Sequence, residues 1–162
     1  MEEFNLTELL NKVVDGMKRK TSVSNITVLV NSSRENITLF ADRGAIRELL
    51  TILLDNAIKF NKKDGSVEVS LKELGRDVII EVKDTGMGIS EKDLPFVFDR
   101  FYKTDSARTR RKTDGFGLGL SIAKEIVVLH KGTIDVKSLV DEGSVFSVKL
   151  PSKCSQTSLR KL

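Results

Sequence analysis

The sequence predicts a two-layer α/β sandwich, in which a mixed, largely antiparallel sheet packs against about three helices. Residues 42–60 and 119–130 repeat apolar residues with the period of an amphipathic helix. Residues 67–71 and 78–82 alternate apolar and polar residues on either side of Gly75, which is typical of a β-hairpin. Amphipathic helices and half-buried strands each need cover for their apolar side, and a helix layer on a sheet provides it.

The first part of the chain is expected to form two helices and two strands. Asn5 and Glu8 have the spacing of a capping box, so an amphipathic helix is expected over residues 6–17. Two short strands are expected next, at residues 26–30 and 37–41, joined by a polar turn at residues 31–34. Asp42 is then a suitable N-cap for the long helix, which ends at about Phe60.

The part beyond the hairpin is expected to alternate loops with regular elements. A glycine-rich loop is expected at residues 85–90, a short helix at 91–99 and a long mobile loop at 103–116. A second helix is expected at residues 119–130, followed by strands at 134–136 and 145–150. Together the elements form one domain over residues 5–151. The polar tail at residues 152–162 is expected to be disordered.

The composition is typical of a soluble globular protein. The chain has 162 residues, and no apolar run reaches the roughly 20 residues of a membrane span. Cys154 is the only cysteine, which excludes an internal disulfide and fits a cytoplasmic location. The basic run at residues 100–112 is typical of a solvated loop. Only Phe101 and Tyr102 lie near it, so the aromatic platform of a nucleic-acid protein is missing and no nucleic-acid partner is expected.

Three alternating glycines precede the helix at residues 119–130. Gly115, Gly117 and Gly119 remove side chains where the backbone approaches a large guest. The unpaired N–H groups and the positive dipole end of the following helix favour a phosphate there. The spacing is neither that of the phosphate-binding P-loop nor that of the dinucleotide-binding loop, so the run by itself fits a flexible loop equally well.

The long helix has polar residues at the border of its apolar face. At about 100° per residue, Asn56 and Lys59 lie together on one flank, beside Ile52. One interpretation is an amide that caps neighbouring backbone and a lysine that reaches water. The other is that the Asn56 oxygen ligates Mg²⁺ and Lys59 contacts phosphate, since Mg²⁺ takes few hard oxygen ligands from protein when phosphates and water supply the rest.

A carboxylate with two nearby glycines follows the second strand of the hairpin. Asp84 could accept a hydrogen bond from the amino group of adenine, while Gly86 and Gly88 let the ring lie against the backbone. The alternative is an aspartate that starts a tight turn. Residues 84–86 also match the aspartic-protease triplet, but that chemistry needs a second carboxylate, which only a dimer could supply.

Four segments resemble the sequence boxes of sensor histidine kinases, in the same order. Residues 55–60 (DNAIKF) resemble the N box and residues 84–88 (DTGMG) the G1 box. Residues 98–102 (FDRFY) resemble the F box and residues 115–120 (GFGLGL) the G2 box. The chain thus resembles, over about residues 5–151, the catalytic ATP-binding domain of a histidine kinase, in the superfamily of gyrase, Hsp90 and MutL. The resemblance implies a Bergerat-type ATP-binding fold.

The resemblance also implies roles for individual residues. Asn56 would ligate Mg²⁺, Lys59 would contact phosphate and Asp84 would read adenine. Lys103 would join Asn56 and Lys59 in catalysis, at the start of an ATP lid over residues 103–114. The remaining nucleotide contacts would come from Phe60, Gly86, Gly88, Ile89, Tyr102, Gly115, Gly117, Leu118 and Gly119.

Two positions depart from the family pattern. Ile52 stands where many relatives have a second asparagine, and where the hydrolysing relatives have a glutamate; an isoleucine cannot act as a base, so phosphotransfer is favoured over free ATP hydrolysis. Lys103 stands where relatives often have arginine, which makes a phosphate contact less directional. These departures keep open a nucleotide-dependent binding module without phosphotransfer. An anti-sigma-type serine kinase is a further alternative, which the F box disfavours.

The implied function is to bind Mg²⁺-ATP and donate its γ-phosphoryl group to a histidine on a dimerisation domain absent from this chain, within a two-component signalling kinase. A response regulator would be an indirect partner, and the isolated domain would be a monomer. His130 is the only histidine and ends a helix, so it is expected to be structural. The phosphoacceptor histidine, the sensor and any membrane anchor are expected on a missing N-terminal part.

Overall fold

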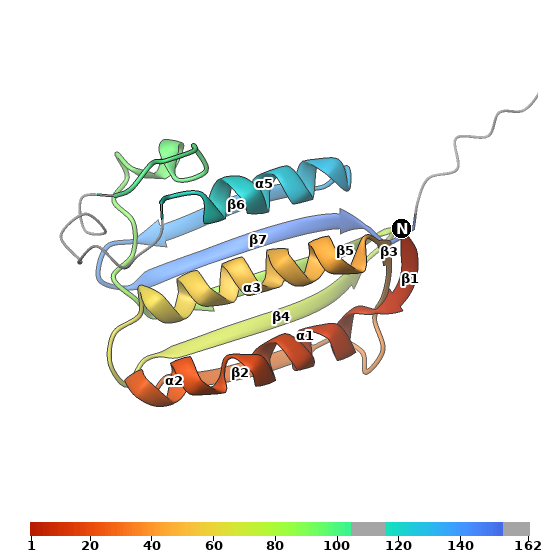
Figure 1. Cartoon of the computed structure of the whole chain (residues 1–162), viewed down its shortest axis with the longest axis horizontal. Coiled ribbons are helices and arrows are strands. Elements are labelled where there is room, and N and C mark those ends of the chain that lie inside the picture. The colour runs from red at the N-terminus through yellow and green to blue at the C-terminus, as the bar shows by residue number, and fades with distance from the viewer. Residues whose placement is uncertain (105–115, 154–162) are drawn as a thin grey trace, which may run out of the picture.

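Five strands form the main sheet of the computed structural model, which describes residues 1–104 and 116–153 (Figure 1). Their order is β2-β4-β5-β7-β6. Their bounds are Thr27–Ser32 for β2, Ser66–Leu74 for β4, Asp77–Asp84 for β5, Thr133–Leu139 for β6 and Gly143–Pro151 for β7. Only the β2–β4 pair is parallel. The prediction of a mixed, largely antiparallel sheet is therefore confirmed.

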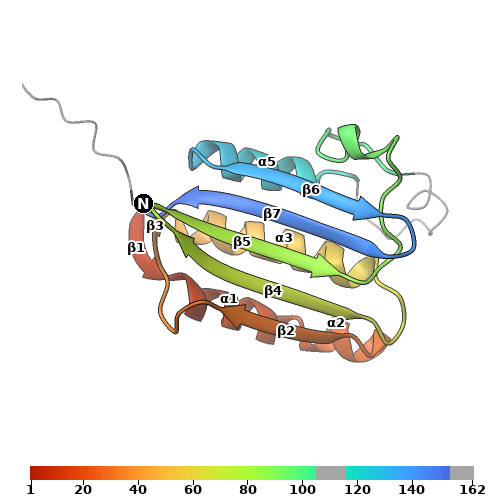
Figure 2. The same cartoon turned by 180° about the vertical axis from the view of Figure 1, so that it is seen from behind.

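The helices lie on one face of this sheet and leave the other face open, as the two opposite views show (Figures 1 and 2). They are α1 (Leu6–Gly16), α2 (Lys18–Ser24), α3 (Arg43–Lys59) and α5 (Gly119–Leu129). The core lies between the layers: Leu49, Leu50, Leu53 and Leu54 of α3 are fully buried. Each such side chain contributes about 1.5–3 kcal/mol through the apolar surface that it removes from water.

Both predicted N-caps are confirmed. The Asn5 carboxamide accepts a hydrogen bond from Glu8 N at 3.0 Å, and the Asp42 carboxylate accepts one from Ala45 N at 3.0 Å. The second bond lowers the pKa of the Asp42 carboxyl. The Glu8 side chain pairs with Lys12 at 2.5 Å, so only the N-cap half of the expected capping box is formed.

The two short strands expected near residues 26–30 and 37–41 exist, but they are not neighbours. β2 pairs in parallel with β4, whereas β3 (Thr38–Ala41) pairs with β1 (Glu2–Asn5), an unpredicted strand, in a separate two-stranded sheet. The physical reason is that a polar turn determines only where a strand ends. The packing of α1 and α3 on the sheet decides which other strand it pairs with.

One predicted helix is wrong, and one helix of the structure was not predicted. The helix expected at residues 91–99 is only the 3-10 turn η1 (Leu94–Phe96), because Pro95 lacks an N–H group and disfavours the α conformation of the residue before it. Helix α2 was not predicted, since none of its residues is buried and it therefore has no apolar stripe. The described ranges thus hold four α-helices, and the predicted architecture of helices packed on a mixed sheet is confirmed.

Some expectations fall on parts that the structure does not describe. Residues 105–115, which include most of the expected long loop, and residues 154–162 of the expected tail lie outside the described residues. Within residues 1–104 and 116–153, no helix has the length and apolar character that crossing a membrane requires.

Candidate functional site

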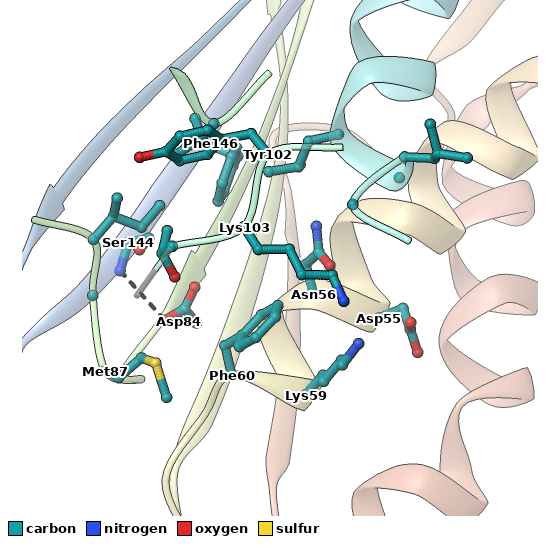
Figure 3. Close-up of a pocket in the computed structure, with 18 of the residues that line it drawn as sticks. Asp55, Asn56, Lys59, Phe60, Asp84, Met87, Tyr102, Lys103, Ser144 and Phe146 are labelled. Atoms are coloured by element: carbon teal, nitrogen blue, oxygen red, sulfur yellow. Dashed lines mark hydrogen bonds between the residues drawn. The ribbon is translucent and has the colours of Figure 1, made fainter. Parts of the chain in front are cut away.

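A pocket of about 370 Å³ opens at the C-terminal end of α3 (Figure 3). It lies between that helix end, the loop after β5, the start of β7 and the start of α5. Most predicted site residues line it: Asn56, Lys59, Phe60, Asp84, Gly88, Ile89, Tyr102, Lys103, Gly117, Leu118 and Gly119. Gly86 is not among the lining residues, and Gly115 lies outside the described residues. Segments far apart in the chain are thus brought together here.

The last turn of α3 supplies the polar residues at one side of the pocket. Asn56 and Lys59 project from it, as the helical spacing predicted, and Asp55 lies next to them (Figure 3). The Lys59 ammonium lies 5.3 Å from the centre of the Phe60 ring, a cation–π distance. Asp55 accepts a hydrogen bond from Lys20 of α2. This end of the pocket therefore carries both cationic groups and hard oxygen atoms.

Asp84 lies at the opposite end, beneath the loop that follows β5. Only 7% of its surface is exposed, and its Oδ1 atom accepts hydrogen bonds from Gly86 N at 2.8 Å and Ser144 N at 3.3 Å. Burial raises the pKa of the Asp84 carboxyl, and the two N–H donors offset part of that rise. A buried acceptor at the pocket wall suits a ligand that donates a hydrogen bond.

The glycines after Asp84 let this loop pass between two other segments. A Cβ atom on Gly86 would lie 2.3 Å from the Phe60 carbonyl oxygen, which also accepts a hydrogen bond from Met87 N at 3.1 Å. Gly88 has a φ of +70°, and a Cβ there would lie 2.0 Å from the Leu139 carbonyl oxygen. Gly86 therefore sits behind the pocket against the end of α3, while Gly88 lines the pocket.

The start of α5 forms the wall beside Asn56. Gly117 has a φ of +74°, and its carbonyl oxygen accepts a hydrogen bond from Phe101 N at 3.0 Å. Gly119 begins the helix, so its neighbourhood carries unpaired N–H groups and the positive dipole end. Ile52 lies outside the pocket lining, and its Cγ2 atom is 3.5 Å from where a Cβ of Gly119 would be. It therefore supports the start of α5 from the side of α3.

Tyr102 and several apolar residues complete the wall. The Tyr102 hydroxyl is hydrogen-bonded to the Asp93 carboxylate, and its ring centre lies 5.6 Å from that of Phe96. The sequence-based prediction missed Asp55, Met87, Val97, Thr104, Phe116, Leu120, Ser144 and Phe146 as lining residues. Several of these missed residues are adjacent in the sequence to predicted site residues, and this adjacency could have identified them. Ser144 and Phe146 had none, because only the pairing of β7 with β5 carries them there.

The oxygen atoms of the pocket fit a magnesium ion that is held mainly by its ligand. The described residues contain no cluster of three or more His, Cys, Asp or Glu side chains able to hold a metal. The Asn56 amide oxygen, beside the Asp55 carboxylate, is the type of hard donor that Mg²⁺ accepts singly when phosphate oxygens and water fill its other positions.

Residues 41–153 match the family of histidine kinase-, DNA gyrase B- and HSP90-like ATPases. Sensor protein CiaH of Streptococcus pneumoniae is 44% identical over 125 residues, 75% of this chain and 28% of CiaH. Sensor protein SrrB of Staphylococcus aureus is 37% identical over 146 residues, 90% of this chain and 25% of SrrB. The chain thus spans only about a quarter of the length of these relatives.

Solved structures agree with these matches. The catalytic domain of histidine kinase ThkA, 31% identical, superposes with a TM-score of 0.82 over 94% of this chain and 97% of that domain. ThkA in complex with the response regulator protein TrrA is 27% identical and gives a TM-score of 0.78, over 93% of this chain and 41% of that chain. The likeness to the isolated domain covers nearly the whole of both chains.

Proposed function

The chain belongs to the histidine kinase-, DNA gyrase B- and HSP90-like ATPases, as a catalytic ATP-binding domain of the sensor histidine kinase type, and from that premise we propose its reaction. It binds Mg²⁺-ATP and transfers the γ-phosphoryl group to a histidine on a dimerisation domain outside this chain. One observation carries the proposal: a single pocket joins a buried acceptor, Asp84, to a cationic end formed by Lys59 and the start of α5.

The Asp84 end of the pocket receives the adenine. Its carboxylate accepts a hydrogen bond from the exocyclic amino group, and a charge-assisted bond of this kind is worth about 1.5–3 kcal/mol. Ile89, Val97 and Phe146 supply apolar surface for the ring. Gly88 has no side chain, which lets this loop pass close to the Leu139 carbonyl at the end of β6.

The α3 and α5 side receives the phosphates. Lys59 neutralises phosphate charge, and the N–H groups around Gly117, Leu118 and Gly119 donate to phosphate oxygens. Asn56 would hold the Mg²⁺, which when bound neutralises charge on the phosphate oxygens. Lys103 lines the same pocket and adds a second cation.

Phosphotransfer then needs little covalent chemistry from this chain. A ring nitrogen of the acceptor histidine attacks the γ-phosphorus, the bond from that phosphorus to its bridging oxygen breaks, and ADP leaves. The chain orients the phosphates and stabilises their charge during this step. Ile52, packed beside Gly119, offers no base to activate water at its position, which favours transfer over hydrolysis.

The test is to mix the chain with the dimerisation domain of its own kinase and with ATP labelled on the γ-phosphate. We expect label on a histidine, which is stable in base and lost in acid. Asn56→Ala should abolish transfer while weakening nucleotide binding less, and Asn31→Ala on β2, whose amide donates to Glu68, is the matched control. Full transfer by Asn56→Ala would refute the role of this residue.

A second candidate is a module that binds nucleotide to regulate a partner and transfers no phosphate. The departures at Ile52 and Lys103 favour it. The same mixture distinguishes the two, because nucleotide binding without labelled histidine would support the module and exclude the kinase. Because ThkA has been solved with a response regulator, we propose a response regulator as the downstream partner here, and a cytoplasmic location for this domain.

A further inference from the structure

Two serines face each other across the last strand pair, next to the pocket. Ser138 of β6 is the register partner of Ser144 of β7, and their Oγ atoms are 2.8 Å apart. Ser144 lines the pocket, is only 6% exposed and donates its backbone N–H to Asp84. Ser138 is not among the lining residues, so any influence that it has on a ligand passes through its neighbours.

The partners of Ser138 fix the position of its proton. Its Oγ accepts a hydrogen bond from Ile89 N at 2.7 Å and lies 2.9 Å from the Gly143 carbonyl oxygen. A carbonyl can only accept, so the single proton of Ser138 goes to Gly143; otherwise two oxygen lone pairs would face each other. The short contact with Ser144 then requires the proton of Ser144. Every donor and acceptor position of Ser138 is used in this arrangement.

This arrangement of protons determines what the Ser144 hydroxyl can offer to a ligand in the pocket. Since the Ser144 hydroxyl gives its proton to Ser138, its Oγ presents only lone pairs elsewhere. The Asp84 carboxylate, which accepts the backbone N–H of the same Ser144, is also an acceptor when ionised (Figure 3). Two neighbouring acceptors favour an amino group and oppose a carbonyl oxygen at the same place, because the carbonyl would leave all of the oxygens without a proton.

We propose that Ser138 is a positioning residue for base selection: by holding the Ser144 hydroxyl, it keeps this end of the pocket acceptor-only and so favours a purine with an amino group at carbon 6 over one with a carbonyl at carbon 6. The inference rests on the nucleotide binding proposed above. The loop–turn contact supports it, because Asp141 N also donates to the Met87 carbonyl oxygen at 2.8 Å and holds the loop and the serine pair together.

The test compares the binding of ATP and inosine triphosphate, whose base carries a carbonyl in place of the amino group, to the 162-residue chain by calorimetry. In Ser138→Ala the Ser144 hydroxyl is released and can donate to the carbonyl. We expect the ratio of the two affinities to fall about threefold to tenfold, the range of one neutral hydrogen bond. Ser138→Thr, which keeps a hydroxyl, should restore the ratio.

The matched control is Ser70→Ala on β4, where a serine hydroxyl also donates to a cross-strand neighbour, Glu81, at 3.3 Å, outside the pocket lining. It should leave the ratio unchanged, which separates base selection from a general loss of stability. If Ser138→Ala does not fold, Ser144→Ala, which removes the hydroxyl itself, should lower the ratio.

The outcomes separate this inference from the proposed function. If the wild type binds ATP and the serine variants keep its ratio of affinities, base selection by Ser138 is overturned and nucleotide binding stands. If the wild type does not bind ATP, the proposed function is overturned, and this inference with it.

Discussion

Asp84 is a carboxylate that the fold buries although burial disfavours its charge. Its raised pKa means that the folded state holds the Asp84 proton more tightly than the unfolded state does. The ionised group therefore destabilises the fold at any pH above that raised pKa, and the destabilisation disappears below the ordinary pKa of an aspartate. A group that is unfavourable for stability and that faces a pocket is a good candidate for a binding role.

The first prediction is that Asp84→Asn weakens ATP binding without lowering the stability of the nucleotide-free chain. The loss of a charge-assisted bond should raise the dissociation constant roughly tenfold to a hundredfold. Because the neutral amide removes the buried charge, the melting temperature at neutral pH should stay the same or rise. Calorimetric titration and thermal unfolding measure the two effects. An unchanged affinity would remove Asp84 from the base site.

The second prediction concerns pH. Since burial raises the pKa of Asp84, lowering the pH should protonate it before ordinary aspartates and reduce its ability to accept the amino hydrogen. ATP affinity should therefore fall as the pH drops through that raised pKa. Asp84→Asn serves as the control, because it removes the titration of Asp84 and keeps every other source of pH dependence. Parallel profiles for the two proteins would contradict the assignment.

Helix α3 links stability to the site, because one element carries the N-cap Asp42, the central core and the pocket residues Asn56 and Lys59.

His130, just after α5, connects that helix to the start of α3. Its Nδ1 donates to the Ile126 carbonyl at 2.7 Å and its Nε2 accepts the Asp42 N–H at 3.1 Å. Both ring nitrogens thus form hydrogen bonds with the protein backbone, in agreement with the structural role expected for this histidine.

The third prediction follows from this helix. Asp42→Ala should lower the melting temperature, because Ala45 N loses its capping acceptor, while Asp42→Asn should keep most of the stability. The pKa of Asp42 is lowered in the fold, so the stabilisation from its ionised form is present above the unfolded pKa and is lost as the pH falls through the folded one. The difference between wild type and Asp42→Ala should accordingly shrink in acid; a constant difference would argue against the cap.

At the scale of the whole molecule, the pocket depends on contacts between distant segments. The loop after Asp84 touches the end of α3 through Phe60 and the β6–β7 turn through Leu139. The space that Gly88 leaves open is occupied by the Leu139 carbonyl, which lies about fifty residues away in sequence. The Asp84 end of the pocket therefore forms only when the sheet is complete.

The fourth prediction uses two glycines with similar positive φ values. Gly75 and Gly88 have φ values of +63° and +70°, but a Cβ on Gly75 meets nothing within 4 Å. Gly75→Ala should therefore cost only the left-handed strain, about 1–2 kcal/mol. Gly88→Ala adds a backbone clash and should lose more stability together with ATP binding. Chemical denaturation and titration of both variants check this, and equal losses would show that strain alone matters.

Local patterns determined a large part of this protein. The caps at Asn5 and Asp42, the hairpin around Gly75 and the flank of α3 that holds Asn56 and Lys59 follow from spacing along the chain, because each depends on residues within a few positions of one another. The resemblance of the ordered boxes also identified the family correctly.

Tertiary structure decided the rest. The parallel β2–β4 pair, the separate β1–β3 sheet and the arrival of Ser144 and Phe146 at the pocket depend on which strands meet. No local signal specifies that choice, since the alternation of side chains tells which face of a strand is buried and not which strand lies beside it. The sequence alone thus identified many of the residues that line the pocket, and the packing of helices on the sheet decided how the pocket is closed around them.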